Sequence, residues 1–306
     1  MGRAELPQLS GRPFITDGGM ETTLIFHRGL ELPHFAAFHL LADERGTEEL
    51  RRYFEPYLAF ARDAGVGVVL DTPTWRASAD WGALLGYSAV EIDDVNRRAV
   101  ELLEDVRGDA ADVVVCGCVG PRGDGYSADT RLTADEAQRY HSRQVGVFAD
   151  TSAQLVAALT LTYADEAIGI VRAAEEAGTP CAISFTVETD GRLPSGEGLG
   201  EAIDRVDAET DGAAAYFMVN CAHPTHFAGA LEAAPWIERL RGVRANASRL
   251  SHAELDEAEA LDEGDPGELA GSFVALRDRL PAVTIVGGCC GTDVRHVGAV
   301  CRAWNA

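Results

Sequence analysis

The chain has 306 residues, of which 46% are hydrophobic and 25% are charged, so its composition is that of a globular protein and not of a disordered or fibrous one. Its 49 acidic residues outnumber 26 basic residues and leave a formal net charge of -23, which repels phosphate backbones and anionic lipid headgroups. We therefore expect small-molecule partners, with no nucleic acid and no membrane among them. Composition and charge predict no particular oligomeric state.

The chain contains no lysine, so all 26 basic residues are arginines. This excludes Schiff-base chemistry on a lysine amine, pyridoxal phosphate attachment and the GK[ST] phosphate loop. The opening sequence MGRAELPQLSGRPF lacks the apolar core of a secretory signal, and we expect a cytoplasmic protein. Seven cysteines are too sparse for a disulfide framework and odd in number, which predicts reduced thiols.

Short β-branched runs alternate with longer helical stretches along the whole chain, a pattern typical of βα units and a parallel sheet. Some of these runs end in polar residues. The predicted strands, in chain order, are 14–17, 66–71, 113–118, 155–159, 181–185, 216–220, 243–246 and 283–286.

Helices are predicted between these strands, for example over 48–64 after the N-cap Thr47, over 134–148 after Thr133, and over 165–177. Eight alternations favour a closed (β/α)8 TIM barrel of the α/β class, formed by residues 1–306 as a single domain. An open doubly wound sheet is the alternative, but the first strand is followed by DGGMET in place of the nucleotide fingerprint G-x-G-x-x-G. In a barrel, functional groups are expected at the carboxyl ends of the strands.

Three cysteines follow predicted strands at that end. Cys289 and Cys290 lie in VGGCCGT after the last strand, where flanking glycines allow a bent turn that aims both thiols at one point. Cys221 follows YFMVN at the sixth strand. Three thiolates with one open position are typical of a catalytic zinc site, since a structural site is normally closed by a fourth protein ligand.

Other interpretations of the cysteines remain open at this point. A cysteine nucleophile with His223 as its partner is conceivable, and His223 is alternatively a zinc ligand or a polar loop residue. The remaining cysteines are interpreted as inert buried side chains: Cys116, Cys118, Cys181 and Cys301. Local motifs of zincins, thiol oxidoreductases and α/β-hydrolases are absent from the sequence.

Three motifs, DGGMETTL at 17–24, VNCAHP at 219–224 and GGCCGT at 287–292, resemble those of the homocysteine S-methyltransferase family. Intervening segments resemble the family in the same order, so the resemblance covers nearly the whole chain, and GGCC is its most specific part. These segments are DTPTWRAS at 71–78, GCVGPRGDGY at 117–126, ISFTVETDGRLPSG at 183–196 and ANAS at 245–248.

The resemblance implies a zinc-dependent barrel of homocysteine-binding type that transfers a methyl group to the thiol of homocysteine and yields methionine. It implies that the catalytic zinc ligands are Cys221, Cys289 and Cys290. The residues expected to bind substrate are Asp17, which matches the family aspartate at the amino group, Gly18, Thr72, Thr74, Trp75 and Asn220. A free thiol has a pKa near ~8.5, so binding to zinc, which deprotonates it, activates it as a nucleophile.

The chain departs from the family where the fourth strand ends. Leu159 stands where the family has a glutamate that helps to bind the substrate ammonium, and Glu21 is a possible substitute. Trp75 stands in place of a tyrosine and offers an indole face to a cationic donor, or packs beneath a helix. Arg76, often glutamine in the family, either orients a carboxylate or lies on the surface.

We expect a small sulfonium donor, S-methylmethionine or S-adenosylmethionine, and homocysteine as the acceptor. Alternatives are a different thiol or selenol acceptor, a betaine-type donor, a zinc hydrolase, or a metal-thiol protein without turnover. No cobalamin-binding module is evident in the sequence.

Overall fold

The computed structural model describes residues 6–231 and 234–306. All eight strands are parallel and pair in chain order into a closed barrel, in which the last strand also pairs with the first. The strands are β1 (Phe14–Ile15), β2 (Gly67–Asp71), β3 (Val113–Val119), β4 (Leu155–Leu161), β5 (Cys181–Phe185), β6 (Tyr216–Asn220), β7 (Leu240–Ala245) and β8 (Ile285–Gly288). The predicted (β/α)8 barrel is therefore confirmed, and the open doubly wound alternative is excluded.

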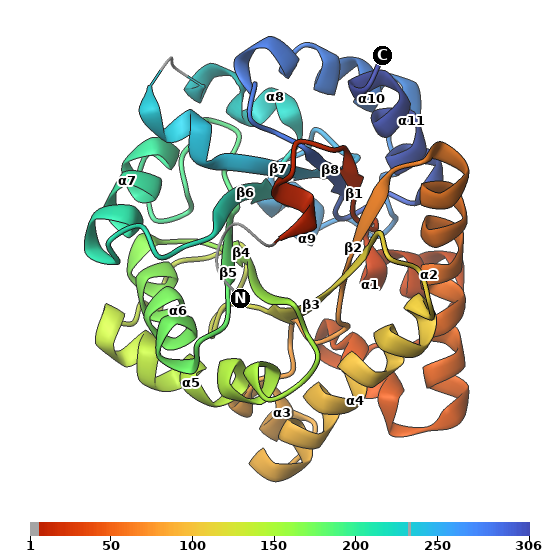
Figure 1. Ribbon diagram of the computed structural model, residues 1–306, viewed down its shortest axis with the longest axis vertical. Helices are drawn as coiled ribbons and strands as arrows, with labels where there is room; N and C mark the ends of the chain where they lie inside the picture. The colour runs from red at the N-terminus through yellow and green to blue at the C-terminus, as the bar shows by residue number, and fades with distance from the viewer. Residues whose placement is uncertain (1–5, 232–233) are drawn as a thin grey trace.

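Helices form an outer ring around the strands (Figure 1). The longer ones bury one apolar face against the barrel, as expected for helices that cover a parallel sheet. In chain order the helices are α1 (Met20–Thr22), α2 (Glu44–Ala64), α3 (Ala79–Leu84), α4 (Ala89–Arg107), α5 (Ala134–Ala149), α6 (Ala164–Ala177), α7 (Leu199–Glu209), α8 (Pro224–Phe227), α9 (His252–Asp256), α10 (Pro266–Val274) and α11 (Val294–Trp304). None of the helices in the described part of the chain is long and apolar enough to span a membrane.

Some predicted boundaries are wrong. Helix α2 begins after Asp43, whose carboxylate accepts a hydrogen bond from the amide of Gly46, so the predicted N-cap Thr47 lies inside the helix. Strand β7 begins three residues early, at Leu240, because Gly242 lets it pass close to Met218 of β6. Strand β8 extends to Gly288, since Gly287 lies against Thr16, where a Cβ would be 1.9 Å from the Thr16 hydroxyl.

Residues 6–13 lie across one end of the barrel, and the site lies at the other end. They cross the near end of the strands in Figure 1, drawn in red. Gln8 is fully buried there, with its amide nitrogen 3.4 Å from the Tyr216 hydroxyl. Its backbone carbonyl accepts a 2.8 Å hydrogen bond from Thr284, which precedes β8. Open space in the barrel is therefore found at the carboxyl ends of the strands.

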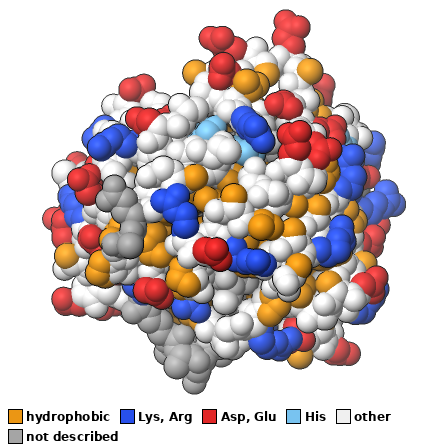
Figure 2. Space-filling view, turned by 90° about the horizontal axis from the view of Figure 1, so that it is seen from above, with side chains coloured by type: hydrophobic (Ala, Val, Ile, Leu, Met, Phe, Trp, Pro, Cys, Tyr) orange, Lys and Arg blue, Asp and Glu red, His pale blue; other side chains and the backbone are white. Residues whose placement is uncertain are grey.

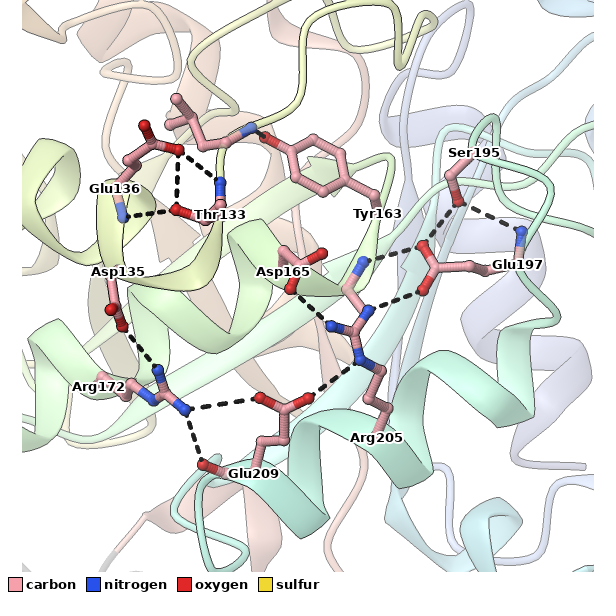
Figure 3. A network of polar contacts seen from close by, with 12 residues as sticks. Thr133, Asp135, Glu136, Tyr163, Asp165, Arg172, Ser195, Glu197, Arg205 and Glu209 are labelled. Atoms are coloured by element: carbon pink, nitrogen blue, oxygen red, sulfur yellow. Dashed lines mark hydrogen bonds and ion pairs between the residues drawn. The ribbon is translucent and has the colours of Figure 1, made fainter.

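The arginines of this acidic chain are distributed among carboxylates, and the face shown in Figure 2 has both charges interspersed. On the helical ring, Arg205 of α7 joins Asp165 of α6 at 2.6 Å and Glu209 at 3.1 Å (Figure 3). Arg172 of α6 pairs with Asp135 of α5 at 3.3 Å. Ion pairs as exposed as these contribute roughly 0.2–1 kcal/mol each to the free energy of unfolding. They therefore serve to orient the helices more than to stabilise the fold.

Helix α11 begins at a charged N-cap that gives the fold a pH-dependent element. Asp293 accepts a hydrogen bond from the Arg295 amide at 2.8 Å and lies 3.1 Å from His296 Nδ1. Burial raises its pKa, but the bonds from His296 and Arg295 outweigh burial and hold the pKa of Asp293 below its usual value. A carboxylate with a lowered folded-state pKa stabilises the protein above its unfolded-state pKa of ~3.9, and this stabilisation is lost as the pH falls.

We expect Asp293→Ala to lower the free energy of unfolding by about 1 kcal/mol at neutral pH, the usual cost of a lost N-cap. The difference from the wild type should shrink as the pH falls below ~4 and through the folded-state pKa, because the carboxylate then becomes protonated. Urea denaturation across this pH range measures the effect. Asp293→Asn keeps a cap and is the control; a difference between wild type and Asp293→Ala that does not change with pH would contradict this account.

Candidate metal and substrate site

A cavity of about 380 Å³ lies at the carboxyl ends of the strands, where barrel chemistry is expected. Its walls combine the loop after β1, the ends of β2, β3, β4, β6, β7 and β8, and the loop around α9. The residues predicted for the site that line it are Asp17, Gly18, Thr72, Trp75, Asn220, Cys221, Cys289 and Cys290. Thr74 does not line the cavity.

The structure brings three thiols together in this wall. The sulfur of Cys221 lies 2.8 Å from that of Cys289 and 3.6 Å from that of Cys290, and all three sulfurs lie within 4.8 Å of one another. The turn that carries the pair is closed by the Cys289 carbonyl, which accepts hydrogen bonds from the amide and the hydroxyl of Thr292. Cys221 and Cys290 are 69 positions apart in the chain, and their thiols nevertheless meet at the same end of the barrel. Their positions after predicted strands indicated this.

Cys221 is held in a backbone conformation that residues other than glycine rarely adopt, with φ of 55°. Its carbonyl accepts hydrogen bonds from Asn246 at 3.0 Å and from the Nε2 of His252 at 2.8 Å, and the Thr186 hydroxyl lies 3.4 Å away. Its amide donates to the carbonyl of Arg244. These contacts hold the strained residue in place and aim its thiol at the other two.

His252 and Tyr126 form a second layer around the thiols. Their rings stack with centroids 4.0 Å apart, and the Tyr126 hydroxyl lies 3.5 Å from the Cys221 sulfur and 3.6 Å from that of Cys290. His252 Nδ1 also lies 2.9 Å from Glu188. Neither residue was identified from the sequence, because only the fold brings α9 and the loop after β3 next to the cysteines.

His252→Ala is expected to weaken metal binding about 10- to 100-fold, the usual effect of losing a residue that orients a ligand. The variant removes the bond to the Cys221 carbonyl and the stack on Tyr126. Titration of the purified apoprotein with zinc against a competing chelator measures the affinity.

His252→Phe keeps a ring beside Tyr126 but cannot donate to the carbonyl, so it separates the two contributions. His34→Ala, on an exposed side chain, is the matched control. Unchanged zinc affinity in both His252 variants would show that His252 does not position Cys221.

The donor set fits a zinc ion. Zn–S bonds of ~2.3 Å in tetrahedral geometry place sulfurs about 3.8 Å apart, close to the 3.6 Å between Cys221 and Cys290, while the 2.8 Å pair is shorter than this spacing. Hydrogen bonds from Cys221 and Cys290 hold the pKa of Cys289 well below its usual value, so the cluster already favours a thiolate at that position. Soft thiolate ligands select zinc over magnesium or calcium.

Asp17 takes part in a buried ion cluster below the thiols. The Arg244 guanidinium binds both Asp17 and Asp71, and the Tyr53 hydroxyl donates to the second oxygen of Asp17 at 3.0 Å. Burial lowers the pKa of Arg244, but the two carboxylates outweigh burial and hold this pKa well above its usual value. Both oxygens of Asp17 are therefore engaged by protein groups, an arrangement that the expected role at a substrate ammonium did not anticipate.

The other predicted substrate residues divide between the cavity and the barrel wall. The Thr72 hydroxyl lies 2.6 Å from that of Thr74, which is fully buried and donates to the Cys118 carbonyl at 2.7 Å. Asn220 accepts from the Ser184 hydroxyl at 2.6 Å, and its amide nitrogen lies 3.8 Å from the Cys289 sulfur. Thr72 and Asn220 thus line the cavity and also brace neighbouring strands, whereas Thr74 lies in the barrel wall.

Gly18 and the aromatic residue Trp75 shape the cavity. A Cβ on Gly18 would lie 2.6 Å from the Thr292 carbonyl, so the loop after β1 packs directly on the turn after the cysteines. The Trp75 indole donates to the Leu159 carbonyl at 3.1 Å. The cation over its ring in the structure is Arg76, at 4.3 Å from the ring centroid. Trp75 is thus a wall of the cavity, and Arg76 is buried and not a surface residue.

Leu159 and Glu21 also face the cavity, which bears on the departure seen in the sequence. Leu159 is 7% exposed and has no polar atom to offer a ligand. Burial raises the pKa of Glu21 to about 7, and nearby Cys289 and Asp17 act in the same direction. His223 lies at the start of α8, where its Nδ1 contacts Thr225, and it is not among the lining residues.

The chain is a (β/α)8 barrel with a cluster of three thiols at the carboxyl ends of its strands, which is where barrel enzymes carry their active sites. The homocysteine S-methyltransferase family matches residues 14–304, and the chain belongs to this family. It is an S-methyltransferase, and the reaction of its family is methylation of the homocysteine thiol.

Two curated relatives carry the same name. The chain is 25% identical to Homocysteine S-methyltransferase 4 of Zea mays, over 94% of this chain and 88% of the relative. It is 24% identical to Homocysteine S-methyltransferase 1 of Brassica oleracea var. italica, over 97% of this chain and 95% of the relative. The metallated form of the homocysteine methyltransferase MmuM from Escherichia coli has the same fold, with a TM-score of 0.74 at 19% identity, covering 98% of this chain and 99% of MmuM.

Proposed function

We propose that this enzyme transfers a methyl group from a small sulfonium donor, S-methylmethionine or S-adenosylmethionine, to the thiol of homocysteine, giving methionine. Zinc is the proposed cofactor, held by Cys221, Cys289 and Cys290. The observation that carries the proposal is the convergence of these three sulfurs, from two distant segments, on the wall of a cavity at the catalytic end of the barrel. When bound, zinc would hold the acceptor sulfur as a thiolate.

The reaction balances without an oxidant or a general base at the methyl group. A lone pair of the acceptor sulfur forms the new S–CH3 bond while the bond between that carbon and the sulfonium sulfur breaks, and the bonding electrons leave on the donor as a neutral thioether. The thiol proton is released to solvent. The protein contributes by positioning, because oriented reactants avoid much of the entropic cost of a bimolecular displacement.

Residues that line the cavity support a role of the protein in positioning the reactants. Tyr126 covers the cysteine sulfurs, which restricts the space next to them. Leu159 at the end of β4 and Trp75 after β2 give the cavity an apolar lining. Such a lining favours methyl transfer from a sulfonium, because the positive charge of the donor disperses during the reaction and strong hydration of that charge would hinder it.

Metal analysis combined with a substrate screen tests the proposal. The purified protein should contain about one zinc per chain and methylate homocysteine with one of the two sulfonium donors. Betaine is tested as an alternative donor, and other thiols and a selenol as alternative acceptors. Metal content without methyl transfer to any of them would contradict the proposed activity, as would hydrolysis that thiols do not inhibit.

Leu159→Glu tests whether the fourth strand sets acceptor selectivity. A carboxylate at this position should favour acceptors with an ammonium group, and we expect the preference for homocysteine over its desamino analogue 4-sulfanylbutanoate to rise about tenfold, the value of a charge-assisted hydrogen bond. The ratio of kcat/KM values measures it. Leu159→Gln, similar in size and uncharged, is the control, and an unchanged ratio would show that this position does not select the acceptor.

A further inference from the structure

The carboxylates that line the cavity differ in whether they are already engaged. Asp17 and Asp71 are bound by Arg244, and Asp262 accepts hydrogen bonds from Ser248 and Gly264. In the described part of the chain, Glu21 has no ion pair or hydrogen bond from another side chain, although it is partly buried in the cavity wall. The carboxyl group of Glu21 accepts a hydrogen bond from its own backbone amide, and a carboxylate withdrawn from water without a counter-charge is costly unless a ligand supplies one.

Glu21 lies on a segment that packs directly on the cysteine turn. A Cβ on the neighbouring Gly19 would lie 2.6 Å from the Cys289 carbonyl oxygen, and the Thr22 hydroxyl accepts a 3.2 Å hydrogen bond from the Gly291 amide. Because residues on both sides of Glu21 are held in this way, the backbone that carries Glu21 is fixed against the cysteine turn. A ligand group that binds Glu21 is therefore held near the thiols.

Arg76 is the second charged group that the protein leaves incompletely satisfied. Its guanidinium is 8% exposed and lies between the rings of Trp75 and Trp81, 4.3 Å and 3.6 Å from their centroids. One hydrogen bond to the Gly123 carbonyl at 3.1 Å and a 3.9 Å contact with Asp124 are its polar contacts, and its Nε is buried without a partner. Stacked on two indoles, it keeps a fixed orientation.

A guanidinium has five N–H donors in a fork that matches a carboxylate, so Arg76 retains donors for an anionic ligand. Burial lowers the pKa of Arg76 to about 10, while Asp124 and Glu21 act in the opposite direction, and the side chain stays cationic at neutral pH. The cavity wall thus holds a partly buried carboxyl group, Glu21, and an underused cation, Arg76, and no ion pair joins them in the described structure, while its other unpaired carboxylates, such as Asp256, are exposed.

We propose that Glu21 and Arg76 bind the zwitterionic headgroup of an α-amino-acid substrate, Glu21 receiving its ammonium and Arg76 its carboxylate. The inference rests on the proposed function and deepens it, because homocysteine and the sulfonium donors named above all carry this headgroup. It also explains how a barrel with Leu159 at the fourth strand and with Asp17 engaged by Arg244 binds an amino acid: the counter-charge comes from the loop after β1. Homocysteine and the sulfonium donors share this headgroup, and experiments with analogues of each substrate show which of them binds Glu21 and Arg76.

Substrate analogues that lack one charge test each residue separately. With a fixed donor, Glu21→Gln should raise the KM for homocysteine about 10- to 100-fold and leave that for 4-sulfanylbutanoate, which lacks the ammonium, within about twofold. Arg76→Gln should raise the KM for homocysteine similarly and spare 3-aminopropane-1-thiol, which lacks the carboxylate. If the pair serves the donor, the same pattern appears with S-methylmethionine against trimethylsulfonium at fixed homocysteine.

Calorimetric titration with methionine gives a second readout that needs no methyl transfer. Binding should weaken about tenfold or more in each variant, while the exposed control variants Glu55→Gln and Arg62→Gln of α2 bind as the wild type does. Arg76→Lys, which keeps the charge without the fork, serves if Arg76→Gln does not fold.

The outcomes separate this proposal from the proposed function. Equal losses for all analogues, or no loss of methionine binding, would overturn the headgroup assignment even if methyl transfer is found. A wild type that binds methionine through both residues but methylates no thiol would leave the headgroup site standing and remove the proposed activity.

Discussion

Cys290→Ser is expected to lose most of the bound zinc, from about one per chain to a small fraction, and to reduce kcat/KM more than ~100-fold. Losing a residue that only orients a ligand costs 10–100-fold in metal affinity or activity, and losing one of three protein ligands should cost more. The cluster holds three thiols, and the other two, Cys221 and Cys289, are themselves proposed ligands, so neither can take the place of Cys290. Metal analysis and initial rates on the same preparation measure both effects.

Cys301→Ser is the matched control, because this thiol is buried on α11 and lies outside the cluster. It should retain zinc and activity within about twofold, since a small change at a site away from the cavity has little reason to alter either. Stoichiometric metal in Cys290→Ser and Cys289→Ser would remove these residues as ligands. Retained zinc with lost transfer would instead assign the thiols to a role other than holding the ion.

Arg244→Met should lower the free energy of unfolding by about 3–5 kcal/mol, the usual cost of removing one partner from a buried ion cluster. The arginine is 5% exposed and binds Asp17 and Asp71, so its loss leaves two carboxylates without their cation in the interior. Chemical denaturation at neutral pH measures the change. Burial raises the pKa of Asp17 to about 7 even beside Arg244, and loss of the guanidinium raises it further. The difference from the wild type should therefore narrow as the pH falls from neutral toward ~4, because the orphaned carboxylate becomes neutral in this range.

Two further variants make this prediction specific. Arg52→Met removes an exposed arginine from surface ion pairs and should change stability by no more than about 0.5 kcal/mol. The triple variant Arg244→Met, Asp17→Asn, Asp71→Asn should recover part of the loss, because it removes the buried charges together. If the single and triple variants are equally unstable, packing of the arginine and not charge pairing accounts for the effect.

Much of the architecture follows from local pattern. The alternation of β-branched runs and helical stretches predicted eight strands, and eight strands pair in that order. The N-cap Thr133 was predicted correctly, since its hydroxyl and Glu136 form a capping box within four residues. The beginning of α2 was not, because Asp43 and Thr47 are both good caps and the choice depends on how the preceding segment packs.

The amino-acid sequence by itself determined the barrel and the positions of three cysteines after strands, because in a parallel barrel every strand end reaches the same rim. The tertiary structure alone decided what surrounds them. Arg244 and Asp17 are 227 residues apart, and their pairing could not be read from either segment. The left-handed backbone of Cys221 and the access of Tyr126 to the thiols depend likewise on contacts between distant loops, since hydrogen bonds and ion pairs across space leave no periodic signal in the chain.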